Sequence, residues 1–249
     1  MKGRVLICAG SDSGGGAGIQ ADIKAVTALG GYAATAITAL TAQDTRGVQG
    51  VVGVAPDFIR LQMRMVLEDI GADALKTGML ADTPTIEAVC DVLESHAAGI
   101  PLVADPVMVA KGGHKLLAEE AVAALRARLL PLAAIITPNL PEAEVLAGMP
   151  IPDVPAMRRA AQRLLAGGAR AVLLKGGHLE AEVLTDLLAT DDGVESFTSP
   201  RIATRHTHGT GCTMASAIAC GLALGMTLRE AVIRARAYVR AAILAAPGL

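Results

Sequence analysis

The segment best suited to chemistry is a short run rich in glycine and hydroxyl groups near residue 210. This run, His206-Thr207-His208-Gly209-Thr210-Gly211-Cys212-Thr213, precedes an alanine-rich stretch with helical character. The order predicts a loop that leads into the N-terminus of a helix, where backbone amides lack partners and bind anions. A phosphoryl group in transfer needs such donors already in place. A glycine hinge packed under a helix would explain an isolated Gly-x-Gly better, but the whole run favours an anion site.

Small and polar residues also follow nearly every predicted strand. In an open parallel sheet, ligands bind outside the carboxyl ends of the strands, so we expect these segments to converge on one edge. The segments are Gly10-Ser11-Asp12, Thr41-Ala42-Gln43-Asp44, Gly78-Met79, Asp105-Pro106, Pro138-Asn139 and Gly176-Gly177-His178.

Four residues at this edge carry groups that suit a metal or a phosphate. Asp105 ends a buried strand, where a carboxylate is costly unless it is paired or bound to a metal. Asn139 and Glu142 have the spacing of a helix capping box, and from the spacing alone this interpretation is favoured. Their oxygen atoms also suit ligation of Mg²⁺. Lys175 is either an exposed residue at a strand end or a point charge for ATP phosphates, and we favour the second.

Apolar runs alternate with amphipathic segments along the chain, which predicts a mostly parallel, doubly wound α/β sheet with helices on both faces. The expected strands are Arg4–Ala9, Ala34–Leu40, Ala74–Thr77, Leu102–Ala104, Ala133–Thr137 and Ala171–Lys175, and the pieces Glu182–Leu188 and Val194–Thr198 are expected to form a hairpin around Asp191-Asp192-Gly193. The expected helices are Gly18–Leu29, Pro56–Asp69, Thr83–Ala97, Leu116–Leu130, Val154–Ala166, Gly211–Leu224 and Thr227–Ala245, the last with a capping box from Thr227 to Glu230.

Composition narrows the function classes. The chain of 249 residues suits one domain, residues 1–249, because no linker is visible. A formal net charge of -2 argues against nucleic acid as a partner, and the apolar runs are too short to span a membrane. Four scattered cysteines without CxxC spacing favour a reducing cytoplasm. With no Trp and only two Phe and two Tyr, any pocket for a flat ligand must be lined mainly by aliphatic side chains or backbone.

The glycine-rich run around residue 210 resembles the C-terminal signature of the ribokinase-like superfamily, in its hydroxymethylpyrimidine/phosphomethylpyrimidine kinase branch of thiamine biosynthesis. Further blocks similar to that branch occur in order along almost the whole chain. They are Ala9 to Asp22, Ile37 to Gln43, Lys76 to Leu80, Asp105 to Met108, Ile136 to Ala143 and Lys175 to His178. The resemblance implies a three-layer αβα sandwich, ATP and Mg²⁺ as cofactors, and often a homodimer. We also expect no fused thiamine-phosphate synthase domain after the kinase segment.

The resemblance also implies roles for individual residues. The expected catalytic residues are Gly209, Thr210, Gly211 and Cys212, and the expected pyrimidine-binding residues are Gly10, Asp22, Gln43, Met79 and Val107. The expected ATP-binding residues are Asn139, Lys175, Thr207 and His208, and the expected metal ligands are Asp105 and Glu142. From the residues alone, Asp22 is equally explained by helix-dipole stabilisation, and Gln43 by an ordinary polar loop.

Two phosphorylations are implied, first of the hydroxymethyl group and then of the resulting phosphate. Sugar kinases of the superfamily carry Asp where Cys212 stands, and an Asp would repel a phosphate nucleophile. We hypothesise that the helix N-terminus lowers the pKa of Cys212 enough for partial base character in the first step.

Three alternatives to this function remain. A pyridoxine or pyridoxal kinase of the same fold is the nearest, although the flap Lys111-Gly112-Gly113-His114 follows Ala110 where some pyridoxal-phosphorylating relatives carry Cys. An inactive nucleotide-binding module is disfavoured because Asp105, Lys175 and the loop from Gly209 to Cys212 are all present. A Rossmann dehydrogenase is weaker still, because the GxGxxG fingerprint is missing.

Overall fold

A computed structural model describes residues 2–109, 116–118 and 120–246. Within these residues a single nine-stranded sheet forms the centre of the molecule, in the order β3-β2-β1-β4-β5-β6-β7-β8-β9. The strands are β1 (Arg4–Asp12), β2 (Tyr32–Gln43), β3 (Val48–Gly53), β4 (Ala74–Thr77), β5 (Leu102–Ala104), β6 (Ile135–Ile136), β7 (Val172–Leu174), β8 (Val183–Thr190) and β9 (Gly193–Pro200). The helices are α1 (Gly18–Ala28), α2 (Pro56–Asp69), α3 (Thr83–His96), α4 (Ala121–Ala124), α5 (Leu140–Ala147), α6 (Val154–Ala166), α7 (Thr210–Ala223) and α8 (Leu228–Leu244).

The centre of the sheet is parallel and its edges are antiparallel. Strands β2, β1, β4, β5, β6 and β7 run the same way, so their carboxyl ends meet at one edge. β3 pairs antiparallel with β2, and the expected β8–β9 hairpin pairs antiparallel with β7. The prediction of a mostly parallel sheet is therefore confirmed.

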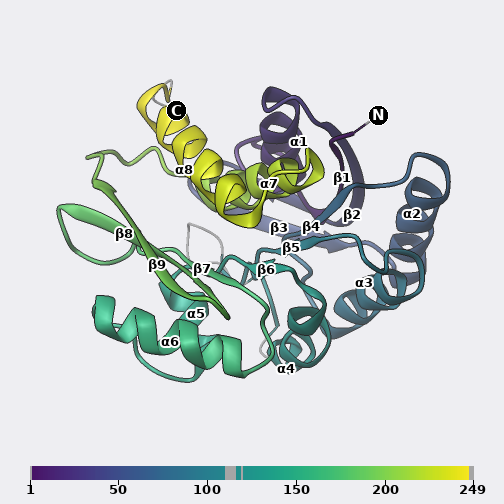
Figure 1. The fold of residues 1–249 in the computed structure, drawn as a ribbon. Coiled ribbons are helices and arrows are strands. Elements are labelled where there is room, and N and C mark those ends of the chain that lie inside the picture. The colour runs from purple at the N-terminus through teal and green to yellow at the C-terminus, as the bar shows by residue number, and fades with distance from the viewer. Residues whose placement is uncertain (1, 110–115, 119, 247–249) are drawn as a thin grey trace.

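Alternating side chains of the sheet build two cores, one on each face. On β1, Leu6 and Cys8 belong to the core under α2 to α6, whereas Val5, Ile7 and Ala9 belong to the core under α1, α7 and α8. Figure 1 shows the two helical layers on opposite sides of the sheet. The expected three-layer αβα sandwich is confirmed, and no helix of the described residues is both long and apolar enough to cross a membrane.

One expected element begins at a different residue, and two elements were not predicted. The expected helix from Leu116 begins later, at Ala121, and continues as a π-helical turn (Leu125–Leu129) and a 3₁₀ turn (Leu130–Leu132). Leu116 instead donates its backbone amide to Met108 O at 2.8 Å. Strand β3 and helix α5 were absent from the predicted elements, although a helix at α5 follows from the capping-box interpretation of Asn139.

Candidate active site

A cavity of about 570 Å³ lies at the edge where the parallel strands end. Its wall combines the loops after β1, β2, β4, β5, β6 and β7 with the loop that precedes α7. All but one of the expected site residues line it: Gly10, Gln43, Met79, Asp105, Val107, Asn139, Glu142, Lys175, Thr207, His208, Gly209, Thr210, Gly211 and Cys212. The sheet topology thus brings together residues that are far apart in the sequence.

Asp22 is the exception. It does not line this cavity, and its carboxylate contacts other side chains of the protein where contact with the substrate was expected. Its side chain has no exposed surface, and its carboxylate accepts hydrogen bonds from Lys76 Nζ at 2.8 and 3.0 Å and from Ser216 Oγ at 2.7 Å. Lys76 is equally buried, yet it lies against the cavity wall. Burial, the largest single influence, would lower the pKa of Lys76, but the charge of Asp22, its hydrogen bond and the nearby Asp105 and Cys212 together raise the pKa, so the ammonium stays charged. The sequence did not predict that Lys76 lies at the site, because no residue near it in the sequence indicates its ion pair with Asp22.

The loop before α7 has the geometry expected of an anion site. Gly209 adopts a left-handed conformation with φ of 77°, which favours glycine, and α7 begins at the next residue. The amides of Gly211 and Cys212 have no acceptor among the described residues, as expected for the first turn of a helix. A methyl group built on Gly211 would lie 3.3 Å from Lys175 Nζ and 3.9 Å from Asp105 Oδ2. The free amides, a cation and a carboxylate therefore meet at one point.

Asp105 and Glu142 are both buried and face the same cavity. Asp105 Oδ1 accepts hydrogen bonds from Thr137 Oγ1 at 2.9 Å and from Lys175 Nζ at 3.2 Å. Burial raises the pKa of Glu142 to about 7, with Lys175 opposing the shift and Asp105 adding to it. Burial acts to lower the pKa of Lys175, but the charges of Asp105 and Glu142 act in the opposite direction and the net pKa is raised. The Lys175 ammonium therefore stays charged.

The capping box from Asn139 to Glu142 is confirmed. Asn139 Oδ1 accepts from the Glu142 amide at 2.9 Å, and Glu142 Oε2 accepts from the Asn139 amide at 2.8 Å. The remaining carboxylate surface of Asp105 and Glu142 fits an oxygen-liganded ion such as Mg²⁺, which proteins hold through one or two carboxylates plus phosphates. No group of three or more His, Cys, Asp or Glu side chains with metal-site geometry exists among the described residues.

Cys212 is partly buried at the start of α7, and its pKa moves in the opposite direction to the hypothesis. Burial raises the pKa of the thiol to about 11, although Lys76 opposes the shift. The thiol is therefore neutral at pH 7. The expectation of a lowered pKa neglected how little solvent reaches this turn.

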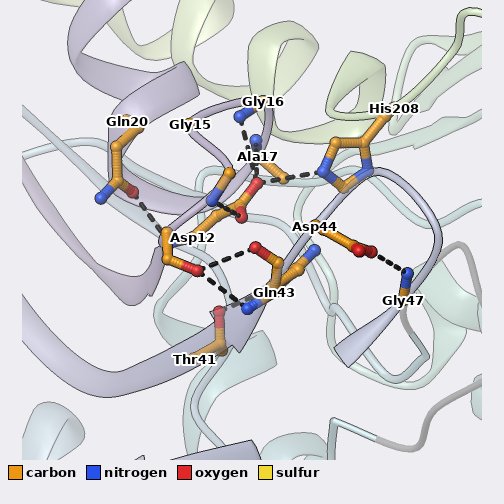
Figure 2. Close-up of polar contacts among 12 residues, drawn as sticks. Asp12, Gly15, Gly16, Ala17, Gln20, Thr41, Gln43, Asp44, Gly47 and His208 are labelled. Atoms are coloured by element: carbon orange, nitrogen blue, oxygen red, sulfur yellow. Dashed lines mark hydrogen bonds and ion pairs between the residues drawn. The ribbon is translucent and has the colours of Figure 1, made fainter. Parts of the chain in front are cut away.

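The other side of the cavity is formed by Gln43 and by the loop at residues 13–17 between β1 and α1, called the glycine loop below. Thr41 Oγ1 donates to Gln43 Oε1 at 3.1 Å, and the Gln43 backbone is joined to Ser13 Oγ by two hydrogen bonds of 2.8 Å (Figure 2). The Ser13 contacts hold the Gln43 backbone at the carboxyl end of β2, and the Thr41 contact orients its side chain. A methyl group on Gly10 would lie 3.0 Å from Met79 Sδ, so a larger residue at position 10 would require the Met79 side chain to shift.

A second cavity of about 690 Å³ adjoins the first and was not predicted. The two share Asn139, Lys175, His178, Thr207, Thr210 and Gly211. Its outer wall comes from the β8–β9 hairpin and α8 and includes the apolar side chains of Phe197, Ile233 and Ile243, and α7 adds Met214. The different character of the hairpin was visible in the sequence, but nothing indicated that its inner face lines a cavity.

Comparisons with known proteins agree on the kind of protein that this chain resembles. A family profile described as phosphomethylpyrimidine kinase matches residues 12–249. A thiamine biosynthesis bifunctional protein of Geobacter sulfurreducens is 55% identical over 97% of this chain, but the chain spans only 49% of that protein. A hydroxymethylpyrimidine/phosphomethylpyrimidine kinase of Streptomyces coelicolor is 49% identical over 97% of this chain and 88% of its own. An ADP complex of a Bacillus subtilis pyridoxal kinase superposes with a TM-score of 0.91 at 40% identity, covering 98% of this chain and 92% of that one.

Proposed function

We infer, from the fact that this chain belongs to the phosphomethylpyrimidine kinase family, that it is a phosphotransferase acting twice on one pyrimidine. It transfers the γ-phosphoryl group of ATP to 4-amino-5-hydroxymethyl-2-methylpyrimidine, and then to the monophosphate, in thiamine biosynthesis. The observation that carries this proposal is the meeting of the Gly211 and Cys212 amides with Lys175 and Asp105 inside one cavity.

The two connected cavities supply the two ligand sites. The pyrimidine lies in the first cavity, between the glycine loop and the aliphatic side chains of Met79 and Val107, with Gln43 facing its polar ring edge. The nucleotide lies in the second cavity, with its phosphates toward Lys175 and Thr207. Phosphoryl transfer then occurs at the boundary that the two cavities share. The amides of α7 stabilise the charge on the transferring group in the transition state.

Cys212 serves the second transfer better than the first. A neutral thiol does not repel the monophosphate, which already carries a negative charge and needs no base. In the first transfer the hydroxyl need not be deprotonated before it attacks, because a loose, metaphosphate-like transition state has little bond formation to the nucleophile. We therefore assign Cys212 as a neutral contact and not as a general base.

Asp105 and Glu142 are the residues that would hold Mg²⁺, which would offset the charge of the ATP phosphates when bound. Lys175, held at 3.2 Å by Asp105, adds a second positive charge on the protein side. Because Asp105 also accepts from Thr137, its carboxylate is fixed before any ligand arrives.

We propose a cytoplasmic homodimer as the working form. All four cysteines are free, and Cys8, Cys90 and Cys220 are buried without a disulfide partner, which suits a reducing compartment. The outer face of α2 carries Phe58, Leu61 and Met65, which are 55%, 42% and 59% exposed. Large apolar side chains spaced along one helix face are unusual on a monomer surface, and a second copy of the chain would cover them.

Pyridoxal kinase activity is the second candidate, because the pyridoxal kinase named above superposes closely on this chain. The sequence feature that weighed against it, Ala110 before the flap at residues 111–114, lies outside the described residues. Turnover with pyridoxal and with the pyrimidine alcohol, measured at equal concentrations, separates the two activities.

The test is to incubate the protein with ATP, Mg²⁺ and the pyrimidine alcohol and to look for mono- and diphosphate by mass. We expect both products in sequence. Lys175→Met should remove most of the activity, whereas Lys2→Met, a matched change at an exposed lysine, should not. Absence of both pyrimidine products from folded wild-type protein would overturn the proposal.

A further inference from the structure

Asp12, at the end of β1, is a buried carboxylate that organises the glycine loop. Its Oδ1 accepts from the Gly14 amide at 2.8 Å, and its Oδ2 accepts from the amides of Gly16 at 3.1 Å and Ala17 at 2.7 Å (Figure 2). Only 2% of Asp12 is exposed, so these donors replace the water that its charge would otherwise need. The shape of the loop that faces the acceptor therefore depends on this one carboxylate.

His208, from the loop before α7, reaches the same carboxylate. Its Nε2 donates to Asp12 Oδ2 at 3.0 Å, across 196 positions of sequence. In Figure 2 the imidazole and the glycine loop approach Asp12 from neighbouring sides. A methyl group on Gly16 would lie 2.6 Å from His208 Cδ2, and one on Gly209 would overlap the Gly16 carbonyl oxygen. The two loops are thus interlocked, with no room for a side chain between them.

The placement of His208 argues against a direct role in nucleotide binding. His208 lines the first cavity but not the second, whereas its neighbours Thr207 and Thr210 line both. Its Nε2 is already engaged by Asp12. The expectation that His208 binds ATP therefore has less support than a contact that joins the two loops.

We propose that His208 is a positioning residue that acts through Asp12. It fixes the glycine loop, which holds the acceptor, relative to the loop at residues 207–212, which holds the transferring phosphoryl group and is called the amide loop below. This inference rests on the proposed function. Each loop holds one of the two reacting groups, and transfer requires their reacting atoms to lie about 3–3.5 Å apart. A link that joins the two loops directly sets that separation.

Loss of His208 should leave the protein folded. Asp12 keeps three backbone donors without the imidazole, so its charge does not become unpaired. We expect His208→Ala to lower kcat/KM for the pyrimidine alcohol by about 10- to 100-fold, as misplacement of reacting groups does. The loss should fall mainly on kcat, and KM for ATP should stay within about twofold, since the nucleotide cavity is not changed.

Two further variants separate positioning from a general structural role. His208→Gln retains a side-chain N–H that can reach Asp12, so it should recover part of the lost kcat. Asp12→Asn combined with His208→Ala should be no slower than Asp12→Asn alone, because the two residues act through one contact. His96→Ala, at the end of α3 and in neither cavity, is the matched control and should behave as wild type.

A readout that needs no substrate makes the test independent of the proposed reaction. Amide hydrogen exchange of residues 13–17 in the ligand-free protein should be faster in His208→Ala than in wild type. In His208→Gln it should be slower than in His208→Ala. Unchanged exchange in His208→Ala, or a raised KM for ATP with unchanged kcat, would overturn the proposal. If exchange changes as expected while wild-type protein turns over no pyrimidine, the proposed function fails and the link between the loops stands.

Discussion

Lys76 Nζ lies 2.8 Å from Asp22 Oδ2, and neither side chain has any exposed surface. Removing one member of such a buried pair leaves the other charge uncompensated, which costs about 3–5 kcal/mol. We therefore predict that Asp22→Asn lowers the free energy of unfolding by roughly that amount in urea titrations. Asp57→Asn, at an exposed carboxylate that also pairs with a cation, should change it little. A stable Asp22→Asn variant with weakened pyrimidine binding would instead favour direct substrate contact.

Glu142 should make stability depend on pH. Its pKa of about 7 in the folded protein exceeds the ordinary value of about 4.3, so the folded state binds the proton more tightly. The free energy of unfolding should therefore fall as pH rises from about 4.3 to about 7, by up to about 3–4 kcal/mol. Urea titrations at pH 5 and pH 8 measure the difference.

The matched variants for this prediction are two changes at capping boxes. Glu142→Gln keeps the capping geometry but removes the titration, so it should flatten the pH dependence. Glu230→Gln changes the corresponding position of the capping box at α8, where hydrogen bonds from Thr227 lower the pKa of Glu230. A pH dependence that survives Glu142→Gln unchanged would contradict the assignment.

Cys212 should react slowly with alkylating reagents at neutral pH. Only the thiolate is nucleophilic, and a pKa of about 11 leaves it scarce at pH 7. The rate of modification by iodoacetamide, followed by mass, should rise about tenfold per pH unit between pH 7 and pH 10. Modification should be accompanied by loss of activity, and Cys212→Ser should resist both. A rate that is fast and level across this range would indicate the activated thiol of the original hypothesis.

The exposed face of α2 should control the oligomeric state. Met65 is 59% exposed, and a charge there would have to be buried if a second copy covers this face. Met65→Glu should therefore convert a dimer to a monomer in size-exclusion chromatography with light scattering. Val183→Glu, at a similarly exposed residue of β8, should not. A wild-type chain that is monomeric at micromolar concentration would contradict the dimer.

The sequence predicted the central strands well because they are buried on both faces. Ala74–Thr77 and Leu102–Ala104 were predicted with their observed bounds, since continuous apolar runs between loops have few other interpretations. Val48–Gly53 was missed because it is an exposed edge strand with two glycines and carries neither alternation nor an apolar run. The start of the helix expected from Leu116 was wrong. The helical spacing of apolar residues extends back to Leu116, but the backbone amides of Leu116 and Leu117 bond to Met108 O instead.

The site was predictable wherever it follows from topology. Residues at the ends of parallel strands must meet at one edge, so Gln43, Asp105 and Lys175 could be grouped without coordinates. The partner of Asp22 could not be predicted, because Lys76 is 54 positions away and both reside in the interior. The direction of the Cys212 pKa depended on how closely its turn packs, and sequence carries no measure of that packing.

The contact between Asp12 and His208 has a consequence for synthesis of the protein. A ribosome adds about 5–20 residues per second, so the 196 positions between the two residues take roughly 10–40 s to translate. During that interval the nascent chain has its acceptor loop but not the histidine that joins it to the amide loop. The acceptor loop is therefore made before the histidine that completes the site, and a chain truncated directly before His208 would keep all nine strands of the described sheet without a complete site.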